Sequence, residues 1–339
     1  MNKEIDLKKY QIRTDLALEA LEGKKYKKDV KIVDNITITR MTIDKKIGKE
    51  INKKQGNYTT IEFEDITDSV NKEKVTKVLI KELKEILKIN KIKENQKCLI
   101  VGLGNDHSTP DSLGPLVINQ VLVTGHLFEI GKVSPGFRNT KALAPGVMGQ
   151  TGIETSDLIK STVECVKPDF LIIIDSLASQ SVERLNKTIQ MTDTGIHPGS
   201  GIGNKRKEIS LETINLPVIA LGVPTVVDAV TIVSDTINYM YKKYSYTKQN
   251  INNPLNKLLT NNFNYLEKEI NLNDFDKTQL LGLIGKLSNN ELRQLIYEVL
   301  TPIGYNLMVT PKEVDFIMEK LSNVIAIGIN KALHDNYIE

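Results

Sequence analysis

The sequence predicts an α/β protein whose mostly parallel sheet carries helices on both faces. Apolar, β-branched runs at 98–101, 169–176 and 217–221 have the length of buried strands. The run at 169–176, DFLIIIDS, has an uninterrupted apolar centre, which is typical of a parallel strand covered on both sides. Stretches with helical periodicity separate these runs, and that alternation favours right-handed crossovers between neighbouring parallel strands.

The composition is that of an ordinary globular protein and excludes several classes of partner. Of 339 residues, 40% are hydrophobic and 26% are charged. A net charge of +3 is too small to indicate binding to nucleic acid or to an anionic membrane. The N-terminal segment lacks the apolar core of a signal peptide, and no apolar run approaches the ~20 residues that span a bilayer. We expect a cytoplasmic protein in which Cys98 and Cys165 are buried structural thiols.

The N-terminal part predicts a β-hairpin followed by a helix. Residues 30–43 and 58–63 alternate apolar and polar side chains, as expected of an antiparallel pair of strands. The Lys-rich stretch 45–54 between them predicts a solvated loop. Residues 75–89 carry an apolar stripe at helical spacing and lead into the strand 98–101.

The stretch 97–122, KCLIVGLGNDHSTPDSLGPLVINQVL, is a strand, a tight loop and a helix. The strand ends at Gly102 and Gly104. Pro110 and Asp111 then precede a stretch of helical periodicity. Proline suits a first helical turn, and a carboxylate suits the positive end of the helix dipole. Asp111 is therefore expected near the carboxyl end of a strand, where ligands bind in open α/β sheets.

The middle of the chain contains a second aspartate in an equivalent position. Residues 131–152 are rich in glycine and proline and predict a long loop at the border of an active site. Asp175 ends the strand at 169–176. Pro224 is predicted to open a helix with apolar residues as far as Ile237. The other elements expected here are a helix at 155–166 and a strand at 188–192.

The C-terminal part predicts helices after a weakly patterned connection. Residues 243–275 are rich in Asn, Lys and Tyr and predict a linker between a core at 16–242 and a helical region at 276–339. The last helix begins with a capping-box motif. We expect the region to form a helical cap or a subunit contact. Its helices are expected at 280–287, 290–300 and 310–333.

Asp111 and Asp175 form the candidate catalytic pair. If their two strands are parallel neighbours, both carboxyl groups emerge at the same edge of the sheet. Two close carboxylates cannot both ionise easily, so they share a proton over a useful pH range. The ionised member can activate a water while the protonated member polarises a carbonyl, which is what hydrolysis of an amide requires. The alternative from spacing alone is that each Asp caps the following helix or turn.

A polar, glycine-rich loop follows the strand expected at 188–192. Its residues His197, Gly199, Ser200 and Gly201 are candidates for lining a substrate groove at the edge of the sheet. A plain surface loop explains the same pattern.

Two other kinds of site have weaker signals. The glycines before Asn105 resemble a dinucleotide-binding fingerprint, but position 107 is His rather than the third glycine, and a tight turn explains them without a cofactor. His107 and His126 have the chemistry to join the aspartates as metal ligands, yet no HExxH motif or Cys/His cluster supports such a site. No GxSxG elbow is present and Cys98 lies inside a strand, so a Ser or Cys nucleophile is not expected. We predict neither a cofactor nor a metal.

Several long stretches are more specific than any of these motifs: YQIRTDLALEA, GLGNDHSTPDSLGP, APGVMGQTGIETSD, KPDFLIIIDSLAS, MTDTGIHPGSGIGNKRKE, LPVIALGVPTVVDAV and NLMVTPKEVDFIMEKLSN. They resemble the germination (spore) proteases of endospore-forming bacteria, from residue 10 to the last helix. The resemblance implies an atypical aspartic endopeptidase that initiates degradation of small acid-soluble spore proteins during germination. The two functional aspartates of that family match Asp111, in TPDSLGP, and Asp175, in IIIDSLAS.

The core of that family is similar to the hydrogenase-maturation peptidases, whose acidic residues at matching positions bind nickel. The resemblance therefore implies the same fold here and leaves a metal-dependent peptidase as one alternative. A nucleotide-binding α/β module that uses residues 102–105 is the other.

Family members are also made as inactive precursors that remove their own N-terminal segment, and they assemble as tetramers. The resemblance thus implies a propeptide at 1–15 and a homotetramer. Thr14-Asp15-Leu16-Ala17 resembles the substrate pattern of an acidic residue followed by an apolar residue and Ala, so we predict cleavage between Asp15 and Leu16 in an exposed segment. The resemblance further implies a location in the forespore and spore core. It also implies spore proteins as substrates, with neither nucleic acid nor membrane as a direct partner.

Overall fold

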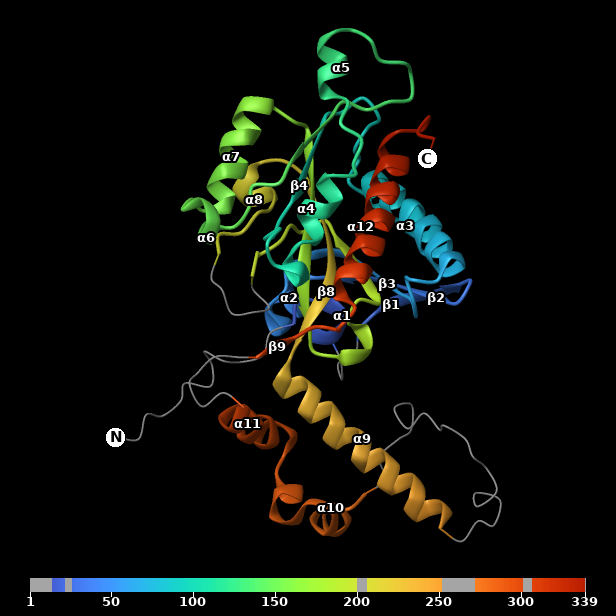
Figure 1. Cartoon of the computed structure of the whole chain (residues 1–339), viewed down its shortest axis with the longest axis vertical. Coiled ribbons are helices and arrows are strands. Elements are labelled where there is room, and N and C mark those ends of the chain that lie inside the picture. Colours follow the sequence, from blue (N-terminus) through green and yellow to red (C-terminus); the bar gives the residue numbers. More distant parts are fainter. Residues whose placement is uncertain (1–13, 22–25, 200–205, 252–271, 301–306, 339) are drawn as a thin grey trace. The chain divides into compact units, whose positions relative to one another are not determined.

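The computed structural model describes residues 14–21, 26–199, 206–251, 272–300 and 307–338, and it divides into two compact units. The larger unit comprises Lys9–Val226 and Thr310–Glu339. The smaller unit comprises Met1–Lys8 and Val227–Val309. Figure 1 shows both units coloured along the sequence.

A single mixed sheet organises the larger unit (Figure 1). One end of the sheet is parallel, because β4 pairs in parallel with β6 and with the edge strand β5. The side that begins with the N-terminal strands is antiparallel from β1 through β8. The α/β class is confirmed, and the sheet is mixed rather than mostly parallel. The strand order is β1 (Lys28–Val33), β2 (Ile36–Ile43), β3 (Gly56–Glu62), β7 (Thr188–Thr192), β8 (Val218–Asp228), β6 (Phe170–Ser179), β4 (Cys98–Gly102) and β5 (Thr140–Leu143).

Helices cover both faces of this sheet, as predicted. Successive residues of a strand point to opposite faces. Ile100 and Ile172 accordingly pack with the helices α3 (Ser69–Ile89), α4 (Leu113–Ile118) and α12 (Val314–Leu333) on one face. Their neighbours Leu99 and Leu171 pack with α7 (Thr155–Val166) and α8 (Leu211–Ile214) on the other face (Figure 1). Burial on both sides explains why the central strands are apolar without alternation.

The antiparallel pairing predicted between 30–43 and 58–63 is confirmed by β2 and β3, but 30–43 contains two strands rather than one, and the loop expected between the pair is wrong. Asp34 and Asn35, with φ of 52° and 68°, form the two-residue turn between β1 and β2. The stretch 45–54 contains the helix α2 (Lys45–Ile51). The side chain of Asp44 caps this helix by accepting hydrogen bonds from the first backbone N–H groups.

The predicted loop at 131–152 also contains regular structure. It includes the edge strand β5 and the short helix α6 (Met148–Thr151), and it follows α5 (Gly125–Glu129). The glycines and prolines concealed a strand because β5 is short and pairs only with β4. Cys98 is buried as expected, whereas Cys165 is exposed.

The helix predicted to begin at Pro224 begins later. Strand β8 continues through Pro224 to Asp228, and the helix α9 (Ala229–Asn250) starts after it. The carbonyl of Pro224 accepts the Asn186 N–H at 2.7 Å, and the carboxylate of Asp228 caps α9 by accepting the Thr231 N–H at 2.8 Å. The β-branched residues that follow Pro224 suit a strand as well as a helix, so periodicity alone misplaced the boundary.

The domain boundaries differ from the prediction as well. The boundary at 242 falls within α9, and residues 252–271 of the predicted linker lie outside the described residues. The smaller unit contains the end of β8 with β9 (Met308–Val309), and the helices α9, α10 (Asp274–Leu281), η6 (Gly282–Lys286) and α11 (Asn289–Leu300).

The last helix, α12, belongs to the larger unit rather than to a separate C-terminal region. Its buried side chains, including Met318, Leu321 and Ile325, join the core cluster that contains α3. No helix of the described residues combines the length and apolar character needed to cross a membrane.

Candidate active site

Asp111 lies on the turn η2 (Thr109–Asp111), which joins β4 to α4. The position of this turn depends on Gly104, whose φ is +119°. A Cβ at Gly104 would lie 2.0 Å from the carbonyl oxygen of Asp111, which also accepts the Asn105 N–H at 2.9 Å. On the other side, the Thr225 hydroxyl of β8 donates to the carbonyl oxygen of Pro110 at 2.5 Å.

The glycines of the apparent nucleotide fingerprint are therefore explained by close packing. A Cβ at Gly102 would lie 2.3 Å from the carbonyl oxygen of Gly114, and a Cβ at Gly114 would lie 2.1 Å from that of Leu103. The end of β4 and the start of α4 thus touch backbone to backbone, which only glycine permits.

Asp175 lies at the adjacent strand, next to the end of β4. Gly102 pairs with Ile174, and the Leu103 N–H donates to the carbonyl oxygen of Ile174 at 2.8 Å. Asp175 is the next residue, it is 6% exposed, and its carboxyl accepts the Ser176 N–H at 2.9 Å. Contrary to the prediction, Asp175 does not end the strand, because β6 continues to Ser179.

The environment favours the protonated form of both carboxyl groups. Burial raises the pKa of Asp111 to about 6, against a hydrogen bond from the backbone of Asn105. Burial also raises the pKa of Asp175 well above its usual range, and the negative charges of Asp111 and then Asp15 raise it further. The three carboxyl groups therefore interact, although they come from separate parts of the chain. The pair therefore favours a proton on Asp175 beside the carboxylate of Asp111.

The predicted processing segment is buried rather than exposed. Leu16 is 0% exposed, and the short helix α1 (Ala17–Ala20) packs with Met41 of β2 and Tyr58 of β3. The expectation of an exposed segment is wrong because its apolar side chains form a core cluster of their own. The position of cleavage, between Asp15 and Leu16, stays a prediction.

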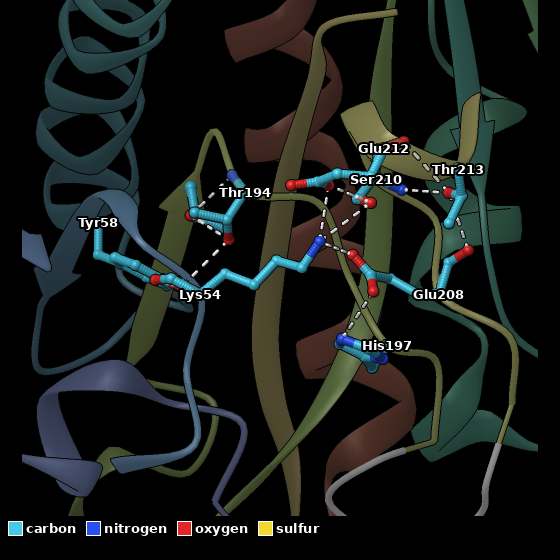
Figure 2. Close-up of polar contacts among 9 residues, drawn as sticks. Lys54, Tyr58, Thr194, His197, Glu208, Ser210, Glu212 and Thr213 are labelled. Atoms are coloured by element: carbon cyan, nitrogen blue, oxygen red, sulfur yellow. Dashed lines mark hydrogen bonds and ion pairs between the residues drawn. The ribbon is translucent and has the colours of Figure 1, made fainter. Parts of the chain in front are cut away.

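His197 lies in a polar cluster at the start of the predicted groove loop. Its Nε2 is 3.4 Å from a carboxylate oxygen of Glu208, and its side chain is 52% exposed. Figure 2 shows the Lys54 ammonium between Glu208 and Glu212, with His197 on the far side of Glu208. Gly199 has φ +69°, and Ser200 and Gly201 lie outside the described residues. The role of this loop in binding substrate stays a prediction.

The donor set does not fit a metal site. Among the residues that the structure describes, no three His, Cys, Asp or Glu side chains are grouped so that they could hold a metal ion. His107 is 82% exposed and lies beside Asp106, and His126 is exposed as well.

Sequence reasoning missed the polar residues that surround Asp15. Lys53 was expected in a solvated loop, but its ammonium donates to the carbonyl oxygen of Asp15 at 3.0 Å. Gln190 of β7 donates to the same oxygen at 3.1 Å. No local pattern distinguishes Lys53 from its neighbouring lysines, and Gln190 occupies an ordinary strand position.

Comparison with known proteins places this arrangement in a family. The family model described as "Germination protease" matches residues 3–339. Proteins named germination protease from Bacillus cereus (strain ATCC 10987 / NRS 248) and Bacillus thuringiensis subsp. konkukian (strain 97-27) are each 48% identical over 355 residues, covering 98% of this chain and 96% of the relative.

Among solved structures, the NiFe hydrogenase maturation protease HycI from Thermococcus kodakarensis KOD1 is 16% identical to this chain. It covers 42% of this chain and 80% of its own, with a TM-score of 0.28. The match of the family model over nearly all of the sequence and the 48% identity across 98% of the chain decide the assignment. This chain belongs to the germination protease family and is a peptidase.

Proposed function

We propose that this chain is an endopeptidase that initiates the degradation of small acid-soluble spore proteins during germination, and that Asp111 and Asp175 are its catalytic pair. The proposal depends on the juxtaposition of two carboxyl groups, that of half-buried Asp111 on the turn after β4 and that of buried Asp175 on the adjacent parallel strand β6. The pKa of each is raised, and the charge of Asp111 raises that of Asp175. Perturbed carboxyl pairs of this kind are typical of hydrolytic sites.

In this mechanism the two aspartates have different roles. Asp111, ionised above about pH 6, accepts a proton from the attacking water. Asp175, protonated, donates a hydrogen bond to the carbonyl oxygen of the substrate. The hydroxide equivalent adds to the carbonyl carbon, the carbon–nitrogen bond breaks, and the leaving nitrogen takes the proton that Asp111 accepted from water. Because burial and the charge of Asp111 favour a proton on Asp175, the pair supplies both the base and the acid.

The finer features of the family extend to this chain as part of the proposal. They are synthesis as a zymogen, removal of residues 1–15 by the protein's own activity, assembly as a homotetramer and location in the forespore and spore core. The 48% identity with relatives named germination protease supports them.

The pH dependence of the rate tests the pair. We expect kcat/KM for cleavage of an acidic spore protein to rise about tenfold per pH unit up to about pH 6, as Asp111 ionises, and then to level off. At higher pH the rate should fall as Asp175 loses its proton. A rate that is independent of pH between 4.5 and 7, measured with the chemical step limiting, would contradict the assignment of Asp111 as the base.

A chelator separates this proposal from the metal-dependent alternative. Because two carboxyl groups and no third grouped ligand are present in the described part of the chain, we expect prolonged dialysis against EDTA to leave the rate of cleavage unchanged. Loss of activity on dialysis, restored by adding back one divalent metal, would favour a metallopeptidase.

A further inference from the structure

We propose that Lys53 and Gln190 bind the carbonyl oxygen of the Asp15–Leu16 peptide bond and stabilise the negative charge that develops on it when that bond is hydrolysed. This inference rests on the proposed function, and it assigns two donors to the carbonyl oxygen in addition to the hydrogen bond from Asp175.

Two side-chain donors converge on one backbone oxygen. The Lys53 ammonium donates to the carbonyl oxygen of Asp15 at 3.0 Å and to that of Thr14 at 2.8 Å. The Gln190 amide donates to the carbonyl oxygen of Asp15 at 3.1 Å. Lys53 follows α2 and Gln190 lies in β7, so the fold brings both to a peptide bond near the N-terminus. Both lengths are those of good hydrogen bonds.

The residues on the nitrogen side of the same peptide bond are also hydrogen-bonded. The Leu16 N–H donates to the hydroxyl oxygen of Thr14 at 2.9 Å. The Gln190 side chain also accepts the N–H of Ala17 at 2.6 Å, so this one amide spans the bond from the Asp15 carbonyl to the next residue. Gln190 is itself buried. The bond between Asp15 and Leu16 is therefore oriented by contacts on both sides.

The segment is also aligned with the strand that carries Asp175. The Asp15 N–H donates to the carbonyl oxygen of Ala178 at 3.2 Å, and the Ala178 N–H donates to the Asp15 carboxylate at 3.0 Å. Ala178 belongs to β6, as does Asp175, and the charge of Asp15 raises the pKa of Asp175. The oriented peptide bond therefore belongs to a residue, Asp15, whose charge acts on Asp175 of the proposed catalytic pair.

Lys53 has the electrostatic character that such a role requires. Desolvation lowers the pKa of Lys53, and the charges of Asp15 and Glu19 act in the opposite direction. A cation removed from water and aimed at a carbonyl oxygen interacts strongly with the charge that forms there. During hydrolysis, water supplies a hydroxyl group to the Asp15 carbonyl carbon and a proton to the Leu16 nitrogen. The developing oxyanion would meet donors already in place.

The experiment measures self-processing of the full-length chain and cleavage in trans. Intact-mass spectrometry would follow the loss of residues 1–15 over time, and a synthetic peptide spanning residues 10–21 would give kcat and KM separately. The variants are Lys53→Met, Lys53→Arg and Gln190→Glu. The Gln190→Glu variant keeps an oxygen that accepts the Ala17 N–H but removes the N–H that donates to the carbonyl oxygen of Asp15. Lys49→Gln, an exposed lysine of α2, is the matched control.

We expect Lys53→Met and Gln190→Glu each to lower kcat by about 10²-fold, with little change in KM, as removal of one oxyanion donor does elsewhere. Lys53→Arg should recover part of the loss, and Lys49→Gln should process like the unaltered chain. Wild-type kcat in these variants, or an effect confined to KM, would show that the two residues only tether the segment. A new N-terminus at a position other than Leu16 would also overturn the inference.

The failure of this inference is distinguishable from failure of the proposed function. If Asp111→Asn and Asp175→Asn stop cleavage while the Lys53 and Gln190 variants cleave at the wild-type rate, only the oxyanion assignment fails. If the Asn variants cleave normally, the proposed mechanism fails as well. Should Lys53→Met not fold, Gln190→Glu and the charge-conserving Lys53→Arg decide the outcome.

Discussion

Asp111→Asn and Asp175→Asn are each expected to lower the rate of cleavage of an acidic spore protein by at least about 10³-fold. Asn can neither take a proton from water nor donate one to a leaving group as a carboxyl group does. Because the two residues act as one unit, the double variant should be no slower than either single variant. Self-processing of the full-length chain should stop in the same variants.

The same substitutions are expected to stabilise the fold, which separates loss of chemistry from unfolding. The folded state raises the pKa of Asp111 to about 6, so it binds a proton more tightly than the unfolded chain does. The free energy of unfolding therefore falls as the pH rises from the unfolded pKa through about 6. Asn does not ionise and so removes this loss of stability, and Asp111→Asn should be more stable than the unaltered protein at pH 7 by about 3 kcal/mol. Denaturant titrations at pH 4 and pH 7 would measure the difference, which should be small at pH 4.

The matched control is Asp157→Asn, an exposed carboxylate of α7 that pairs with Lys207. It should leave the rate unchanged. Near-normal turnover by Asp111→Asn or Asp175→Asn would remove that residue from the mechanism, whatever its effect on stability.

Gly104→Ala is the second substitution with a large expected effect. The positive φ of Gly104 is unfavourable for Ala, and the added Cβ would lie 2.0 Å from the carbonyl oxygen of Asp111. The turn that carries Asp111 must then move. We expect a stability loss of about 2–4 kcal/mol and, because small displacements of catalytic groups are costly, a fall in kcat of about 10²-fold. Denaturant titration and steady-state kinetics would measure the two effects.

Gly149→Ala provides the control for Gly104→Ala. Gly149 lies in the short helix α6, and a Cβ there would meet no atom within 4 Å. It should leave both stability and kcat nearly unchanged. Normal kcat in Gly104→Ala would mean that Asp111 tolerates movement of its turn, and the geometric account of the catalytic pair would be wrong.

The elements that local sequence predicts well are those whose pattern is repeated along the segment itself. The apolar runs of β4 and β6 predicted buried parallel strands, and the structure makes them neighbours in parallel register. The alternation in 30–43 and 58–63 predicted the antiparallel pairing of β2 with β3. The two aspartates could be found because Asp175 continues one of these runs and Asp111 lies on the turn after the other.

Elements that depend on distant partners were predicted poorly. Strand β8 passes through Pro224 because it lies between β7 and β6, which its own residues do not reveal. The helix α12 packs in the core of the larger unit because α3 presents an apolar face to it. It begins at Val314 rather than at 310, and the side chain of Glu313 does not cap it.

By itself, the sequence determined the α/β class, the membership of the germination protease family and the candidate pair Asp111 and Asp175. Tertiary structure alone decided that Asp15, Lys53 and Gln190 meet at one carbonyl oxygen. Periodicity reports which side of an element is buried, whereas a meeting of three residues from separate segments depends on the order and register of strands in the sheet. Those are set by packing over the whole unit, so no local pattern contains them.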